Sequence, residues 1–281
     1  MTKFKKHFRS IVTGIAIGTA SACSASSDEL GTWIGNFTGD EKRQIMDYLV
    51  KSDEVVLYYG SQIIKHDLDG NETADFVITV KVKGSSGRYG GMEHIVVLRT
   101  INESLSLSTA TKKAFCPGFA PGRKLSLMDI DDDGLKDIVD QRVYDIGIGQ
   151  PENHTLVLHN DGRQFIQVFS RQSFGPVDFQ DLDGDGKVEL VEPTNEFKIF
   201  LDSVLWPVVY RWERTGFREA SSEFPEFYGK RLPDFRETHS AAKKKNLAFK
   251  EKRGKDNPIR VNIMRAMDVY IQRAQAISGV E

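Results

Sequence analysis

The stretch DLDGDGKVELVEP, residues 181–193, places Asp181, Asp183 and Asp185 at alternate positions before Gly186 and an apolar run. Alternate acidic side chains in a tight loop bring their carboxylates to one side, where the oxygens can surround a hard cation. The run after the glycine is apolar and strand-like. We therefore predict a cation-binding loop followed by a strand, and the rest of the chain shows how often this unit recurs.

Two further stretches repeat this pattern. They are DLDGNETADFVI, residues 67–78, and DIDDDGLKDIVD, residues 129–140. Each has oxygen-bearing side chains at its first, third, fifth and ninth positions. The candidate metal ligands are Asp67, Asp69, Asn71 and Asp75; Asp129, Asp131, Asp133 and Asp137; and Asp181, Asp183, Asp185 and Glu189. The loops begin 62 and 52 residues apart, which indicates an internal repeat.

A predicted β-hairpin follows each loop. TLVLHNDGRQFIQVF turns at Asn160-Asp161-Gly162, WPVVYRWERTGFREA turns at Thr215-Gly216, and HIVVLRTINESLSLS turns near Asn102. Phe165 and Phe217 each lie 36 residues after the first aspartate of their loop. Each repeat therefore predicts a strand, a cation loop, two strands, a hairpin turn and a fourth strand.

These loops and this strand order resemble the FG-GAP/VCBS repeats of integrin-type propellers and of many secreted bacterial proteins. The resemblance covers about residues 55–221. It implies an all-β, mainly antiparallel fold that is β-propeller-like, with three or more four-stranded calcium-loop repeats in residues 32–229. Three blades are fewer than a closed ring usually has. Either VVLYYG and SQIIKH, within residues 55–66, supply further strands, or the repeats stay open and are capped by the C-terminal helix.

Calcium is the cation that these loops fit best, because it takes six to eight oxygen ligands in a flexible shell. Gly134 and Gly186 permit the inward turn of the backbone, whereas the first loop has Glu72 at that position. Magnesium prefers a stiffer octahedron, and zinc prefers His or Cys. The third loop also has EF-hand spacing up to Glu192, but the predicted strands around it and Pro193 after it argue against an EF-hand.

The N-terminus reads as a secretory signal peptide over residues 1–22, with four basic residues before the apolar segment IVTGIAIGTA. Ala20-Ser21-Ala22-Cys23 resembles the lipobox of bacterial lipoproteins, which implies lipidation of Cys23 and a tether over residues 23–31. The chain is then expected in the periplasm or outer membrane, and plain secretion is the alternative. If Cys23 is not lipidated, a bridge to Cys116 is open in an oxidising compartment.

The ends of the body are predicted to be helical. Residues 40–51 form a short helix with Asp40 as its cap. Residues 230–281 comprise a basic linker or helix face, either solvated or on an anionic membrane, and then an amphipathic helix from Pro258 to about Gly279. The apolar positions of that helix, which dock on the body or bind a partner helix, are Ile263, Met267, Tyr270, Ala274 and Ile277.

Composition and the missing motifs limit the function. The chain is 40% hydrophobic and 28% charged, as in soluble globular proteins, and its net charge of −2 becomes −6 without the signal. This acidic balance argues against a nucleic-acid partner. The six histidines are scattered, and no nucleophile elbow, zinc-protease motif or phosphate loop is present. We therefore predict a secreted or lipid-anchored, calcium-stabilised binding scaffold without catalysis that contacts a protein or glycan. The alternative is a hydrolase or lyase on the same scaffold.

Overall fold

The computed structural model describes residues 37–51, 55–56, 61–82, 93–101, 104–110, 119–145, 152–196 and 205–280. The predicted signal peptide, the lipidation site Cys23, the tether and Cys116 lie outside the described residues.

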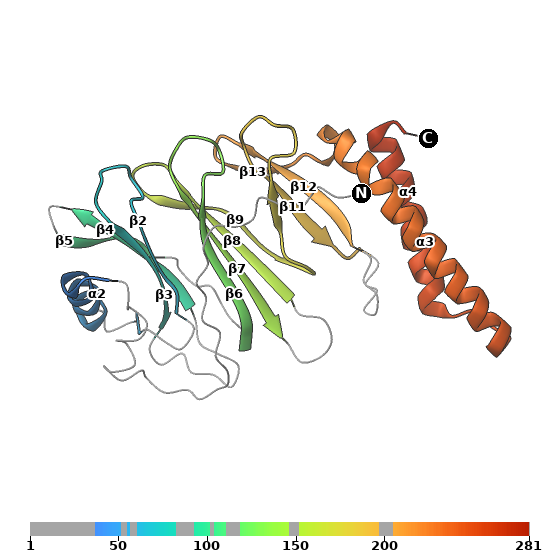
Figure 1. Ribbon diagram of the computed structural model, residues 1–281, viewed down its shortest axis with the longest axis horizontal. Helices are drawn as coiled ribbons and strands as arrows, with labels where there is room; N and C mark the ends of the chain where they lie inside the picture. Colours follow the sequence, from blue (N-terminus) through green and yellow to red (C-terminus); the bar gives the residue numbers. More distant parts are fainter. Residues whose placement is uncertain are drawn as a thin grey trace.

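The strands form three antiparallel sheets in chain order (Figure 1). The first contains β2 (Ile63–His66), β3 (Asp75–Val82), β4 (Glu93–Ile101) and β5 (Ser104–Ala110), and β1 (Val55–Val56) pairs with the end of β3. The second contains β6 (Phe119–Met128), β7 (Asp137–Asp145), β8 (Glu152–Asn160) and β9 (Phe165–Ser173). The third contains β10 (Asp178–Gln180), β11 (Glu189–Thr194), β12 (Trp206–Glu213) and β13 (Gly216–Glu219).

The predicted repeat of four antiparallel strands is confirmed in all three units. In each unit the acidic loop joins the first strand to the second, and a hairpin joins the third to the fourth. Phe165 and Phe217 lie at equivalent places near the start of the fourth strand, and each packs toward the preceding sheet. VVLYYG and SQIIKH supply β1 and β2, so both contribute strands to the first sheet.

The sheets pack face to face in a row, because alternate side chains of a strand point to opposite faces. Between the first and second sheets lie Val77, Ile95, Val97, Ile138, Leu156 and Leu158, among others. Between the second and third lie Val139, Val157, Phe169, Leu190, Tyr210 and Trp212. The middle sheet is therefore buried on both faces.

Helices cover the two outer faces of this stack (Figure 1). Ile45 and Leu49 of α2 (Gly39–Lys51) pack on the first sheet. α3 (Pro225–Arg253) and α4 (Pro258–Ser278) form a hairpin on the third, after a 3-10 turn at Ser221–Glu223. Tyr228 of α3 lies flat on Trp206, and its hydroxyl donates to the Pro207 carbonyl at 2.7 Å. Among the described elements, the first and third sheets do not meet, so the stack is open and capped.

The predicted all-β class is wrong. The chain combines three antiparallel sheets with two long packed helices, of 29 residues in α3 and 21 in α4. The basic stretch after residue 230, predicted as a linker or helix face, belongs to α3. Its charges and Pro233 obscure the helical pattern, yet Phe224, Tyr228, Leu232 and Phe235 recur at helical steps and are buried.

The other predicted helices are close to those observed. Asn257 caps α4 by accepting from the backbone N–H groups of Ile259 and Arg260, and Gly279 ends the helix with a φ of 67°. The predicted cap of α2 is wrong: Thr38, not Asp40, exchanges hydrogen bonds with Glu41 in a capping box. Within the described residues, no helix has both the length and the apolar character needed to cross a bilayer.

Candidate metal sites

The three acidic loops lie along one edge of the stack, between the first and second strand of each sheet (Figure 1). Neighbouring repeats are tied together there. The Val188 N–H donates to the Ile130 carbonyl at 2.8 Å, which links the third loop to the second. The Asn160 side chain donates to the Leu68 carbonyl at 2.6 Å, which links the second repeat to the first loop. The loops therefore form one continuous row of acidic turns.

All three loops share one backbone conformation, with left-handed residues at the fourth and sixth positions. These residues are Gly70 (φ 74°), Asp132 (61°) and Gly184 (80°) at the fourth, and Glu72 (64°), Gly134 (87°) and Gly186 (88°) at the sixth. Glycine adopts this conformation without steric strain, whereas a residue with a Cβ is destabilised in it. Glu72 therefore keeps the shape of its loop although it lacks the residue type that favours it.

The same backbone hydrogen bonds hold each loop. The N–H of the sixth residue donates to the first aspartate, at 2.8 Å in the first loop, 3.0 Å in the second and 3.2 Å in the third. The N–H of the second residue donates to the ninth carboxylate, at 3.1, 3.0 and 2.9 Å in the same order. The first and ninth acidic side chains thus face the interior of the loop.

The loops bring most of the predicted ligands together. Carboxylate oxygens lie within 4.8 Å of one another in the groups Asp67, Asp69 and Asp75; Asp129, Asp131 and Asp133; and Asp181, Asp183 and Glu189. Asp137 groups instead with Asp131 and His159. At the fifth position, Asn71 and Asp185 accept the N–H groups of Thr73 and Lys187, at 2.8 and 2.9 Å. These clusters could each hold a metal ion.

The ninth carboxylate is buried in every repeat, and its charge is costly there. Burial raises the pKa of Asp75, Asp137 and Glu189 above the ordinary value, against the backbone N–H groups that lower it. Burial, and then the charges of Asp133 and Asp129, likewise raise the pKa of Asp131. A bound cation would compensate these buried negative charges.

A basic residue faces the ninth carboxylate from the third strand of each sheet, and the sequence reasoning missed it. The residue is Arg99, His159 or Arg211. In each sheet it lies one position beyond the last ladder pair, on the side of the ninth residue. The sequence held a signal for two of them, because His159 and Arg211 each lie 30 residues after the first aspartate of their loop.

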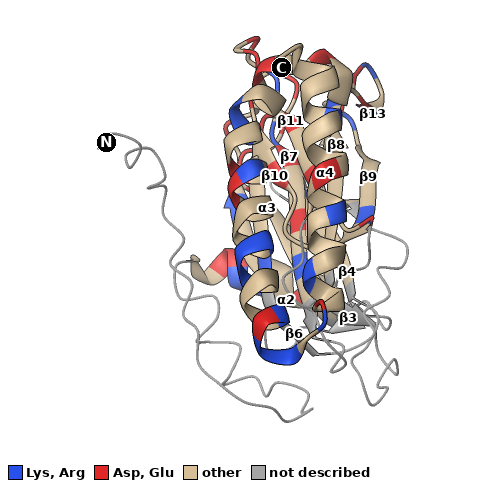
Figure 2. Ribbon diagram, turned by 90° about the vertical axis from the view of Figure 1, so that its right-hand side faces the viewer, with Lys and Arg blue, Asp and Glu red and all other residues tan. Residues whose placement is uncertain are grey.

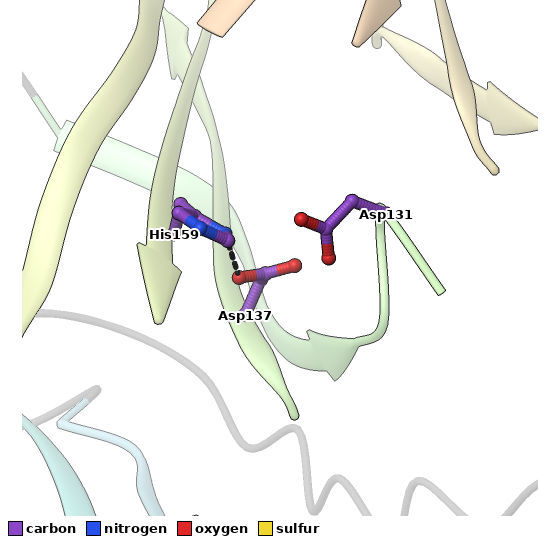
Figure 3. Close-up of side chains that lie close together, drawn as sticks. All are labelled: Asp131, Asp137 and His159. Atoms are coloured by element: carbon purple, nitrogen blue, oxygen red, sulfur yellow. Dashed lines mark hydrogen bonds and ion pairs between the residues drawn. The ribbon is translucent and has the colours of Figure 1, made fainter. Parts of the chain in front are cut away.

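The contacts of these basic residues differ among the repeats. Arg99 lies 3.8 Å from Asp69, and it also donates to Asn160 and to the Gly162 carbonyl. Arg211 pairs with Asp183, and its Nε lies 3.5 Å from Glu189. In the middle repeat, His159 Nδ1 lies 3.0 Å from Asp137. Figure 3 shows this contact as a dashed line. The ring of His159 also packs on Trp212. Among the described residues, a guanidinium therefore lies against the first and third clusters and not against the second.

The middle loop is the least compensated of the three. Asp129 Oδ1 and Asp131 Oδ1 are buried and have no hydrogen-bond partner among the described residues. Lys136 is 4.0 Å from Asp129, and the facing side chain is an imidazole rather than a permanent cation. The carboxylates of the middle loop thus have fewer neutralising contacts than those of the other two loops. A bound cation should therefore stabilise the middle loop most.

No protein family model, curated protein or solved structure matches this chain. The chemistry of the sites therefore follows from their geometry alone, and the resemblance to FG-GAP/VCBS repeats stays a prediction.

Proposed function

We propose that this chain is a calcium-stabilised binding scaffold, secreted or lipid-anchored through Cys23, that contacts a protein or glycan without catalysing a reaction. The observation that carries the proposal is the row of three loops with one backbone conformation, each of which gathers acidic side chains beside a buried carboxylate at its ninth position. Metal bound in such loops fixes the first two strands of every sheet, which is a structural role.

Calcium suits the donors better than other common cations. Oxygen ligands from Asp and Glu dominate every cluster, and His159 is the single nitrogen donor in the groups found among the described residues. Hard oxygen donors favour calcium or magnesium, and the irregular shape of these loops favours the more flexible shell of calcium.

The alternative of a hydrolase or lyase has little support in the described part of the chain. The Ser170 hydroxyl lies 3.2 Å from His154 Nε2, which is the geometry of a nucleophile and a base. However, His154 Nδ1 has no hydrogen-bond partner among the described residues, so no acid orients the ring. The hollow on α3, lined by residues between Ser240 and Glu251, is shallow and belongs to the helical hairpin rather than to the sheet that holds this pair. We therefore keep the scaffold as the proposal.

The metal is tested by thermal unfolding with calcium and with EDTA. At millimolar calcium and a dissociation constant on the order of 0.1 mM, each occupied site should add about 1–2 kcal/mol of stability. Magnesium should replace calcium poorly. An unfolding temperature that EDTA leaves unchanged would rule out the metal. The scaffold role is tested by pull-down and glycan binding with and without calcium, where turnover of a hydrolase substrate would favour the alternative.

The same measurement across pH gives a second readout. The raised pKa values of Asp75, Asp137 and Glu189 mean that the metal-free folded protein binds more protons than the unfolded chain. Their contribution to stability is therefore present below the unfolded pKa, about 4, and is lost as pH rises through the folded values. In EDTA the loops should destabilise the protein as pH rises, and calcium should reverse this loss. A calcium effect that is largest in acid would contradict the assignment.

A further inference from the structure

The far end of the α3–α4 hairpin carries the strongest concentration of positive charge in the described chain. We define the hairpin tip as residues 240–260, which hold eight Lys/Arg and two Asp/Glu, a net charge of +6. The tip lies away from the sheets in Figure 1, and Figure 2 shows basic residues along this part of α3. The rest of the chain is acidic, so the charge is localised.

Hydrogen bonds between α3 and α4 hold the hairpin tip in one conformation. The buried side chain of Asn246 donates to Asp256 at 3.1 Å and accepts the Asn257 N–H at 2.8 Å, which ties α3 to the start of α4. Ala242 and Asn246 face the partner helix and are buried. Lys243, Lys244, Lys245 and Lys252 are exposed, and no carboxylate within the described residues lies within 4 Å of them. Their charges are therefore available to a partner.

The outer face of the tip places Leu247 and Ala248, together with Lys244 and Glu251, between two basic flanks. At 100° per residue, Lys243 and Lys250 lie on one flank of α3, and Lys245 and Lys252 lie on the other. Between them a shallow hollow is lined by Ser240, Lys243, Lys244, Leu247, Ala248 and Glu251. Leu247, in this hollow, is 53% exposed. Lysines that flank an exposed leucine can extend to phosphates while the leucine enters the headgroup region.

We propose that the hairpin tip binds the surface of a membrane rich in anionic phospholipids, with α3 lying along it and Leu247 inserted shallowly. Charge complementarity favours this partner, because juxtamembrane lysine clusters bind anionic headgroups without a specific pocket. Lipidation at Cys23, a prediction from the sequence, would hold the chain near such a surface. The inference concerns a site that is separate from the metal loops, and it stands without them.

Nucleic acid is the competing polyanion, and the composition of the tip favours lipid. Single-stranded nucleic acid binds on aromatic side chains that stack with bases, whereas Phe249 is the one aromatic residue of the tip and is half-buried. Six of the eight basic residues are lysines, which act as hydrated point charges rather than as bidentate phosphate ligands.

The test is co-sedimentation with vesicles, using the chain without its predicted signal peptide and with Cys23→Ser to remove lipidation. Vesicles of phosphatidylcholine alone are compared with vesicles that also contain phosphatidylglycerol. We expect binding to the anionic vesicles only, weakened by salt. The fourfold variant Lys243→Ala, Lys245→Ala, Lys250→Ala and Lys252→Ala should bind at least about 100-fold more weakly, since each lysine contributes roughly a fivefold gain.

A matched control removes four exposed basic residues elsewhere, by Arg43→Ala, Lys124→Ala, Arg163→Ala and Arg214→Ala. This control should keep nearly all binding, and circular dichroism should show that both variants are folded. Leu247→Ser should weaken binding several-fold without changing its dependence on salt. The proposal is overturned if the control variant loses as much affinity as the tip variant. It is also overturned if neutral vesicles bind equally, or if the tip binds DNA more tightly than anionic vesicles.

Discussion

At the scale of single residues, Glu72 stands at the sixth position of the first loop, where the other two loops have glycine. The equivalent residues, Gly134 and Gly186, adopt φ values of 87° and 88° with no side chain to strain the backbone, whereas Glu72 adopts 64°. A left-handed conformation costs a residue with a Cβ about 1–2 kcal/mol. The first loop thus stores strain that the other two avoid at this position.

Glu72→Gly should therefore stabilise the protein by about 1 kcal/mol, less than the full strain because glycine also loosens the unfolded chain. Urea unfolding in the presence of EDTA measures this effect without metal. Glu72→Ala removes the carboxylate but keeps the Cβ, so it should not stabilise. If alanine stabilises as much as glycine, the effect comes from charge and the strain argument is wrong.

At the scale of the loop and its facing strand, the three repeats should differ in affinity for calcium. Arg211 lies against Asp183 and Glu189, so it competes with a cation at the third loop, and Arg99 does so more weakly at the first. The middle loop faces His159 instead. We expect the middle loop to bind calcium most tightly.

Arg211→Gln should increase the calcium affinity of the third loop about tenfold, because it removes a positive charge from the edge of the cluster. The same variant should be less stable in EDTA, since the buried Glu189 then loses its cationic partner. Titration calorimetry measures calcium binding to Arg211→Gln and to Asp131→Asn, which disables the middle loop. The comparison shows which measured affinity belongs to which loop. Arg43→Gln is the control, because Arg43 pairs with Asp40 on α2, which packs on the first sheet rather than on the third. Unchanged affinity in Arg211→Gln would show that the guanidinium does not compete.

At the scale of the whole molecule, an open stack of sheets must protect two outer faces. The hairpin performs this role on the third sheet, where it covers Val191, Trp206 and Val209. An uncovered apolar sheet face promotes association between molecules. The capping helices are therefore as much a part of the fold as the repeats.

A chain that ends at Ala220 should self-associate, because it exposes this face of the third sheet. Light scattering after size-exclusion chromatography measures the effect. Tyr228→Phe is the control: it keeps the hairpin and removes only the hydroxyl, with its hydrogen bond to Pro207, at a cost of about 1–3 kcal/mol, and it should stay monomeric. A truncated chain that is monomeric and unfolds like the intact protein would contradict the capping role.

The sequence by itself determined the features that depend on near neighbours in the chain. The acidic loops follow from the spacing of Asp181, Asp183 and Asp185 around a glycine, which acts over a few residues. The start and end of α4 follow from Asn257 and Gly279 in the same way. Repetition of these local signals then predicted the order of strands.

Only the tertiary structure decided what depends on contacts between distant residues. Arg211 and Glu189 are 22 residues apart in the chain, and they face each other because β12 pairs with β11. α3 is helical although Pro233 interrupts its pattern, because Tyr228 and Phe235 bury their rings against Trp206. Whether three repeats close or stay open depends on which surface covers the outermost sheets. Here helices cover them. Local periodicity predicted the amphipathic helix near the C-terminus, but it did not decide between closure of the repeats and capping.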